Sequence, residues 1–291
     1  MSRLRRVWTL FSGACAATLV LALAPAGQAH AGTSGPTPYY LALGDSLSQG
    51  VQPNSSGQSV ETNQGYADDL YSLYRNEVPG LQLAKLGCPG ETSTSMLTGA
   101  GSPCTYGAGS QVAQAVSFIE THHVVLITID IGANDVDGCL SGGTINGPCI
   151  ATGLTNIGNN LPVILYMLRA AAGAGVPIVG MNYYDPFLAL WLQGSAGQGL
   201  ATQSVALTTY LNGTVLQPIY TAFSDPIADV QSAFQTTDFT PLPWTGQPVN
   251  VTLICALTWM CAPSPVGPNI HANVFGYGVI TGAFIQEIGV L

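Results

Sequence analysis

Four short segments of the chain carry residue types suited to acyl-transfer chemistry. They are Gly44-Asp45-Ser46-Leu47, Cys88-Pro89-Gly90-Glu91-Thr92, Gly132-Ala133-Asn134-Asp135 and Pro268-Asn269-Ile270-His271. Together they supply a hydroxyl that can act as a nucleophile, backbone and carboxamide N–H groups that can hold an oxyanion, and an imidazole that can act as a general base. The chemistry requires that these groups meet at one place in the fold.

The elements that must position these groups follow from the hydrophobic pattern. Short apolar runs predict strands, and longer stripes of apolar residues at helical spacing predict helices. The predicted strands are Tyr39–Leu43, Leu81–Leu86, Val124–Ile131, Val176–Met181 and Ile227–Val230, and the predicted helices are Tyr66–Asn76, Gln111–Glu120, Leu154–Ala172, Thr202–Phe223 and Val274–Ile288. This alternation favours a doubly wound parallel sheet with helices on both faces.

The segments fall where such a fold binds ligands. The first three come directly after predicted strands, and the fourth precedes the last predicted helix. Because ligands of open parallel sheets sit beyond the carboxyl ends of the strands, we expect the four segments to gather at one edge.

In this order, the four segments resemble the blocks of the SGNH branch of the GDSL hydrolase family, over about residues 39–291. The resemblance implies a three-layer α/β/α sandwich with a five-stranded parallel sheet, in a single domain spanning residues 32–291. It implies that Ser46 attacks an ester carbonyl and that His271 is the general base and acid. The oxyanion hole would be the backbone N–H groups of Ser46 and Gly90 and the side-chain amide of Asn134.

One position departs from the family pattern. The family's last block is usually D-x-x-H, but the residue three before His271 is Pro268. Because some members use a backbone carbonyl there, we expect a Ser46–His271 dyad in which the Pro268 carbonyl orients the imidazole. If a carboxylate served instead, Asp185 would be the first candidate.

The N-terminus has the pattern of a secretory signal peptide. Arg3, Arg5 and Arg6 precede an apolar stretch, and an A-x-A ending predicts cleavage after Ala31 and a secreted protein. Six cysteines remain after cleavage and form three close pairs, which we expect to be the disulfides Cys88–Cys104, Cys139–Cys149 and Cys255–Cys261. The mature net charge would be 3 − 15 = −12.

Composition and missing motifs exclude other classes. Six basic residues cannot form a nucleic-acid-binding surface, and no apolar run after the signal peptide reaches the ~20 residues of a membrane span. No G-x-G-x-x-G follows a strand, no C-x-x-C occurs and no G-x-S-x-G occurs, so we expect no cofactor, no metal and no α/β-hydrolase elbow. We expect a monomer that acts on a small-molecule ester.

The substrate is the least determined property. Two long loops are predicted, Pro186–Gly199 and Thr240–Asn269, and their tryptophans Trp191, Trp244 and Trp259 either wall an acyl pocket or pack the loops onto the domain. The first alternative favours lipid or fatty-acyl esters. A carbohydrate acetylesterase of the same fold, or an inactive ligand-binding member, remains the alternative.

Other polar residues have structural interpretations. We expect local turn hydrogen bonds at Asp45 and Asp135, a buried structural carboxyl at Asp130, a helix cap at Ser48, and pocket or core positions for Tyr183 and Tyr184. His122 and His123 precede a strand, so we expect them on the surface, away from the chemistry.

Overall fold

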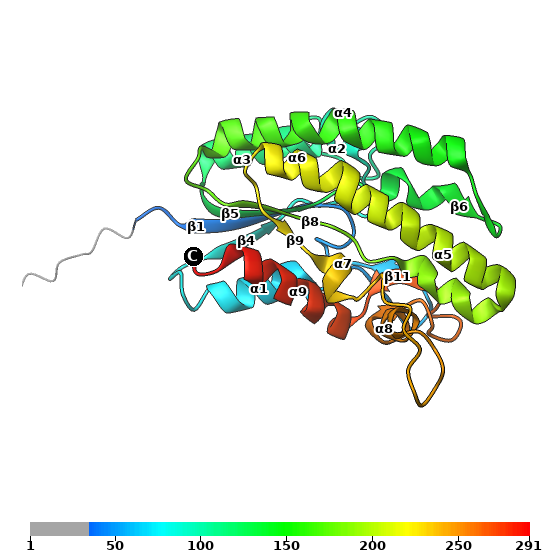
Figure 1. Ribbon diagram of the computed structural model, residues 1–291. Helices are drawn as coiled ribbons and strands as arrows, with labels where there is room; N and C mark the ends of the chain where they lie inside the picture. Colours follow the sequence, from blue (N-terminus) through cyan, green and yellow to red (C-terminus); the bar gives the residue numbers. More distant parts are fainter. Residues whose placement is uncertain (1–34) are drawn as a thin grey trace, which may run out of the picture. The chain divides into compact units, whose positions relative to one another are not determined.

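Five parallel strands form the central sheet of the computed structural model, which describes residues 35–291 (Figure 1). In spatial order they are β4 (Gln82–Lys85), β1 (Pro38–Gly44), β5 (His123–Asp130), β8 (Ile178–Met181) and β9 (Ile227–Ala228). Neighbouring strands pair in parallel throughout. From β1 the chain crosses first to β4 and then in the opposite direction to β5, so the switch point of the sheet lies between β1 and β5, where such folds bind ligands.

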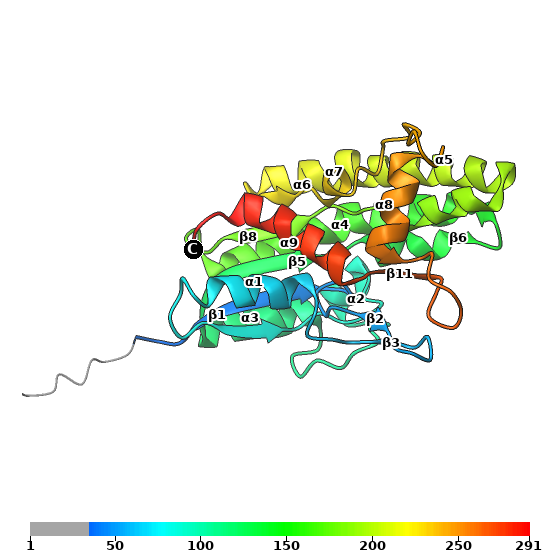
Figure 2. The ribbon, with the colours of Figure 1, turned by 90° about the horizontal axis from the view of Figure 1, so that it is seen from below.

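Helices cover both faces of the sheet. One face carries α2 (Ser93–Thr98), α3 (Gln111–Thr121), α4 (Gly147–Ala172) and α6 (Gln217–Ala222), and the other carries α1 (Tyr66–Tyr74) and α9 (Val274–Ile288) (Figures 1 and 2). The three-layer α/β/α sandwich expected from the resemblance is therefore confirmed.

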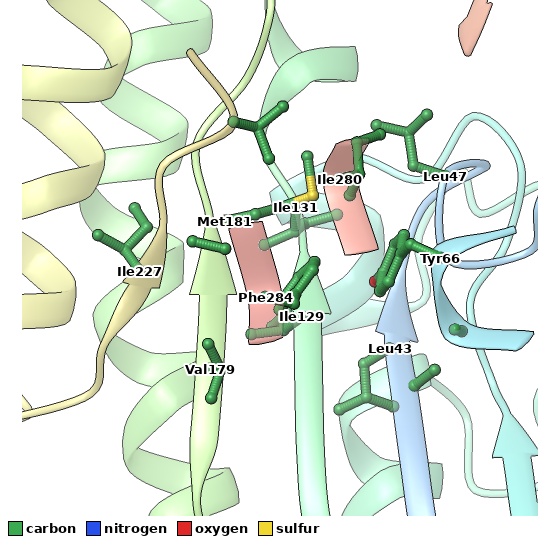
Figure 3. Packing of buried hydrophobic residues seen from close by; sticks show 14 of the residues in the cluster. Leu43, Leu47, Tyr66, Ile129, Ile131, Val179, Met181, Ile227, Ile280 and Phe284 are labelled. Carbon is green, nitrogen blue, oxygen red and sulfur yellow. The ribbon is translucent and has the colours of Figure 1, made fainter. Parts of the chain in front are cut away.

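The buried core explains why these strands are almost continuously apolar. Strand β1 is fully buried from Tyr40 to Leu43, because helices lie on both of its faces. Tyr66 of α1 and Phe284 of α9 stack with their ring centroids 4.6 Å apart, and both lie over the strands of the sheet (Figure 3).

The predicted strands and the main helices agree with the structure to within a few residues, with three exceptions. Helix α4 begins earlier than predicted, at Gly147, because Asn146 caps it and Pro148 is tolerated in its first turn. The predicted helix Thr202–Phe223 is divided into α5 (Ser195–Tyr210), a π-helical turn (Leu211–Leu216) and α6. Helix α2 was not predicted, because six residues are too short to show an apolar period.

The two long loops were wrongly predicted to be irregular. Residues Pro186–Gln193 form a 3₁₀ helix, which leads into α5. The second segment contains α8 (Val249–Leu257) and β10 (Thr258–Trp259), which pairs antiparallel with β11 (Asn269–Ala272). The short helix α7 (Val230–Ala233) follows β9.

Two more hairpins lie outside the central sheet: β2 (Gln52–Pro53) pairs with β3 (Ser59–Val60), and β6 (Leu140–Ser141) pairs with β7 (Thr144–Ile145). All three expected disulfides are present, Cys88–Cys104, Cys139–Cys149 and Cys255–Cys261. The predicted signal peptide lies outside the described residues. Between residues 35 and 291, none of the helices has both the length and the apolar character that a membrane crossing needs.

Candidate active site

The turn that carries Ser46, the predicted nucleophile, follows β1 and is called the nucleophile turn below; its neighbours hold it in place. Gly44 has φ +125°, and a Cβ there would collide with the carbonyl oxygen of Asp130, so only glycine fits. The buried Gln111 amide bonds Gly44 twice, accepting from its N–H at 2.7 Å and donating to its carbonyl at 2.9 Å. Ser46 follows in the turn and is 8% exposed.

Two aspartates beneath Ser46 shape this turn. Asp45 Oδ1 accepts the Leu47 N–H at 3.0 Å, as a local turn hydrogen bond should. Asp130 is fully buried and accepts the Tyr66 hydroxyl at 2.6 Å, which confirms its structural interpretation. Burial raises the pKa of Asp130 well above its usual range and raises that of Asp45 to about 6. Ser48 is not a helix cap; its hydroxyl donates to the Asp45 carbonyl at 2.8 Å.

The two backbone N–H groups expected to form the oxyanion hole are available to donate to a substrate oxygen. Within residues 35–291, neither the Ser46 N–H nor the Gly90 N–H donates a hydrogen bond. Gly90 has φ +84°, which favours glycine, and it lies in the loop closed by the Cys88–Cys104 disulfide. Both N–H groups therefore have the unmet hydrogen-bonding capacity that an oxyanion would satisfy.

Asn134 is in place beside the nucleophile turn. Its Nδ2 donates to the Glu91 carbonyl at 3.0 Å and to Asp45 Oδ2 at 3.2 Å, which ties together the segments that follow β1, β4 and β5. Asp135 does not make the local bonds expected of it. It instead accepts the N–H and the hydroxyl of Ser93, both at 2.7 Å, and so fixes the start of α2 to this loop.

His271 lies on β11, just before α9. Asn273 caps α9 by accepting the N–H groups of Phe275 and Gly276, and donates to the Ala256 carbonyl at 2.8 Å, which holds the end of β11 in place. Burial lowers the pKa of His271 to about 4, because the cationic imidazole loses its hydration without gaining a charged partner. The imidazole is therefore neutral at pH 7, as a general base must be.

The imidazole has a hydrogen-bond partner that the sequence did not predict. His271 Nδ1 lies 2.7 Å from Asn269 Oδ1, so the hydrogen bond assigned from the sequence to the Pro268 carbonyl is made here by the Asn269 side chain. Asp185 is not the partner either. It is fully buried, accepts the Ser204 hydroxyl at 2.6 Å and the Phe187 N–H at 2.9 Å, and begins a 3₁₀ helix.

Ser46, Asn134 and His271 line one cavity at the carboxyl edge of the sheet. The space between its walls is about 870 Å³ when the open solvent at its mouth is included. The remaining wall is mostly aliphatic and includes Leu47, Val136, Leu140, Ile145, Ile150, Leu154, Phe187, Leu207, Leu211 and Ile270, together with Tyr183 and Tyr184.

Within residues 35–291 no hydrogen bond joins Ser46 to His271; such catalytic bonds often tighten only when substrate binds.

The tryptophans do not line this cavity, so the first of the two alternatives, that they wall an acyl pocket, does not hold. Trp191 packs against Phe239 with ring centroids 5.4 Å apart, and Trp259 donates to Gln52 Oε1 at 3.3 Å. Trp244 is 78% exposed. The apolar wall comes instead from the 3₁₀ helix after β8, from α4, α5 and the β6–β7 hairpin.

One further carboxyl, that of Asp137, stands in this wall. Burial and the nearby carboxyls of Asp45 and Asp185 raise its pKa to about 8. Asp137 itself therefore adds little negative charge to the cavity at neutral pH. In residues 35–291 there is no group of three His, Cys, Asp or Glu side chains that could hold a metal ion. His122 and His123 are exposed, as predicted.

Two residues that shape the candidate site were not predicted from the sequence. Gln111, which holds Gly44, carries no local signal, because its partner is 67 residues away. Asn269 could have been noticed, because a carboxamide two residues before the histidine on a strand lies within reach of Nδ1.

Comparisons with known proteins identify the family and the fold. The profile of the GDSL-like lipase/acylhydrolase family matches residues 42–277. The structure is similar to that of an extracellular lipase from Streptomyces rimosus, with 20% identity and a TM-score of 0.51, over 86% of this chain and 99% of that one. It is also similar to a phospholipase A1 from Streptomyces albidoflavus NA297, with 16% identity and a TM-score of 0.53, over 87% of this chain and all of that one. At these identities the likeness shows the fold alone. The sequence matches no curated protein.

Proposed function

Because this chain belongs to the GDSL-like lipase/acylhydrolase family, whose members are serine ester hydrolases, we propose that it hydrolyses fatty-acyl esters through an acyl-enzyme on Ser46. The observation that carries the proposal is that Ser46, Asn134 and His271 line the same apolar cavity.

The reaction uses His271 first as a base and then as an acid. Ser46 Oγ attacks the ester carbonyl while its proton passes to His271 Nε2. The imidazolium then gives that proton to the leaving alcohol, which leaves the acyl group on Ser46. Water, activated by the same imidazole, attacks the acyl-enzyme and releases the carboxylic acid.

The oxyanion formed in both steps is stabilised by three donors. The N–H groups of Ser46 and Gly90 make no other hydrogen bond within residues 35–291. Asn134 Nδ2 would donate to the oxyanion the N–H that it otherwise donates to Asp45 Oδ2. At 3.2 Å this is the longer of its two hydrogen bonds. One such donor stabilises the transition state by about 3–4 kcal/mol.

The cavity wall supports an acyl chain longer than acetyl. Its aliphatic side chains extend from Leu47, beside the nucleophile, to Leu154 of α4 and Leu207 of α5. Each methylene of an acyl chain buried there contributes about 0.8 kcal/mol.

The test is hydrolysis of p-nitrophenyl esters of increasing acyl length. We expect kcat/KM to rise from acetyl to octanoyl, and Ser46→Ala to abolish turnover while the exposed Ser117→Ala leaves it unchanged. A preference for acetyl would contradict the fatty-acyl substrate and favour a sugar acetylesterase. No hydrolysis by the folded protein would favour a ligand-binding member.

We also propose that the protein is exported and that residues 1–31 are removed. The three disulfides support this, because such bonds persist in oxidising compartments. The N-terminal sequence of the exported protein should begin at Gly32, and a cytoplasmic, uncleaved product would refute the proposal.

A further inference from the structure

The strand that carries His271 is held by a hairpin that directly follows the nucleophile turn. We propose that the β2–β3 hairpin positions the catalytic imidazole through a hydrogen-bonded path from Ser59 to Asn269 to His271, which makes Asn269 a positioning residue in place of the usual carboxylate. The proposal rests on the function proposed above.

The Asn269 amide has one possible orientation. The backbone N–H of His271 can only donate, and it lies 3.1 Å from the amide atom that also faces Nδ1 at 2.7 Å. That amide atom must be the oxygen, because a nitrogen could not accept the bond. An oxygen cannot donate, so Nδ1 carries the imidazole proton, and Nε2 is left bare to accept the proton of Ser46.

Ser59 holds the other end of the amide. Asn269 Nδ2 donates to Ser59 Oγ at 3.0 Å, across 210 residues of sequence. A rotation of the amide that broke this bond would also turn Oδ1 away from the imidazole. The Ser59 hydroxyl therefore helps to keep the His271 tautomer that is protonated at Nδ1.

The hairpin is itself fixed at both ends. At its base, Val51 N–H donates to the Ser46 carbonyl at 3.1 Å, and Gln52 accepts the indole N–H of Trp259, the strand neighbour of Asn269. At its tip, a Cβ on Gly57 would collide with the carbonyl oxygen of Pro265, so the tip lies against the loop that leads to β11. The nucleophile turn and the strand that carries His271 are therefore both attached to the β2–β3 hairpin.

An amide partner differs from a carboxylate in charge. The titratable groups that share the cavity with His271 are Asp45, Asp137, Tyr183 and Tyr184, and the Tyr184 hydroxyl donates to the Ile270 carbonyl at 2.8 Å. None of them is hydrogen-bonded to the imidazole within residues 35–291. Asn269 supplies orientation without the negative charge that would stabilise an imidazolium.

Three variants and one control test the path. Asn269→Ala should lower kcat by about 10–100-fold with KM little changed, because a mispositioned imidazole affects the transition state more than binding. Asn269→Asp should keep most of kcat and move the acidic limb of the pH profile up by about one unit or more, because a carboxylate favours the imidazolium. Ser59→Ala should lower kcat in the same direction by a smaller factor, and Ser55→Ala, an exposed serine of the same hairpin, should have no effect.

A second measurement does not depend on turnover. The NMR signal of the His271 Nδ1 proton should be present in the wild type and in Asn269→Asp, and lost or exchange-broadened in Asn269→Ala. Wild-type kcat and an unchanged Nδ1 signal in Asn269→Ala, or an unmoved acidic limb in Asn269→Asp, would overturn the proposal. If the folded wild type hydrolyses no ester, the proposed function fails, and the Nδ1 signal still decides whether Asn269 holds the imidazole.

Discussion

The acidic limb of activity should lie well below the pH usual for a histidine-dependent hydrolase. Burial lowers the pKa of His271 to about 4, and only the neutral imidazole can accept the Ser46 proton. With that pKa about 90% of the imidazole is neutral at pH 5, whereas with the ordinary value of about 6.5 only about 3% would be. The two cases differ about 30-fold in kcat/KM at pH 5.

The assay is kcat/KM for a short, soluble p-nitrophenyl ester between pH 3.5 and pH 8, with each sample made alkaline before the absorbance is read. Circular dichroism at each pH confirms that the protein stays folded. The imidazole can be titrated separately by NMR in Ser46→Ala, where no turnover interferes. A midpoint near pH 6.5 in both experiments would refute the reasoning, because it would mean that the imidazole is solvated or paired with a carboxylate.

Three further predictions concern the cavity. Asn134→Ala should lower kcat by about 10²–10³-fold with KM nearly constant, because its amide bonds the oxyanion more strongly than the ground state. The pKa of Asp137 is raised to about 8, so the folded protein binds this proton more tightly than the unfolded chain does, and the stability that this provides is lost as pH rises from about 4 to about 8. The melting temperature of Asp137→Asn should therefore exceed that of the wild type by a few degrees at pH 9 and by almost nothing at pH 4. Leu207→Trp, which fills the cavity from α5, should lower the octanoyl-to-acetyl ratio of kcat/KM about tenfold or more, whereas the exposed Leu192→Trp should leave it unchanged.

The order and type of the main elements could be predicted from the sequence because each has a local cause. The strands are short apolar runs, as at Val124–Ile131, which Gly132 follows, and Ser110 caps the predicted helix that begins at Gln111. The segment from Pro186 to Gln193 was wrongly predicted to be a loop, because its composition fits both a buried loop and a helical turn. Its structure is fixed by Asp185, whose carboxylate accepts the Phe187 N–H.

The candidate site could be predicted as a set of residues but not as a network. Ser46, Gly90, Asn134 and His271 stand in recognisable segments, since each follows a strand or precedes a helix. The partner of the imidazole was missed because D-x-x-H directed attention three residues back, to Pro268. The side chain two residues back had to be seen in space, where β11 places its amide against Nδ1.

The apolar cavity and the low pKa of His271 have one physical cause. The aliphatic wall that can bind an acyl chain also removes water from the imidazole, and this favours its neutral form. At pH 7 the effect on the amount of active base is small, since a histidine with a pKa of about 6.5 is already about 76% neutral there. The low pKa increases the fraction of neutral imidazole appreciably only below about pH 6, whereas it makes the imidazole a weaker base at every pH. An amide at Asn269 preserves this low pKa, and a carboxylate would raise it, so the missing aspartate and the apolar wall act in the same direction.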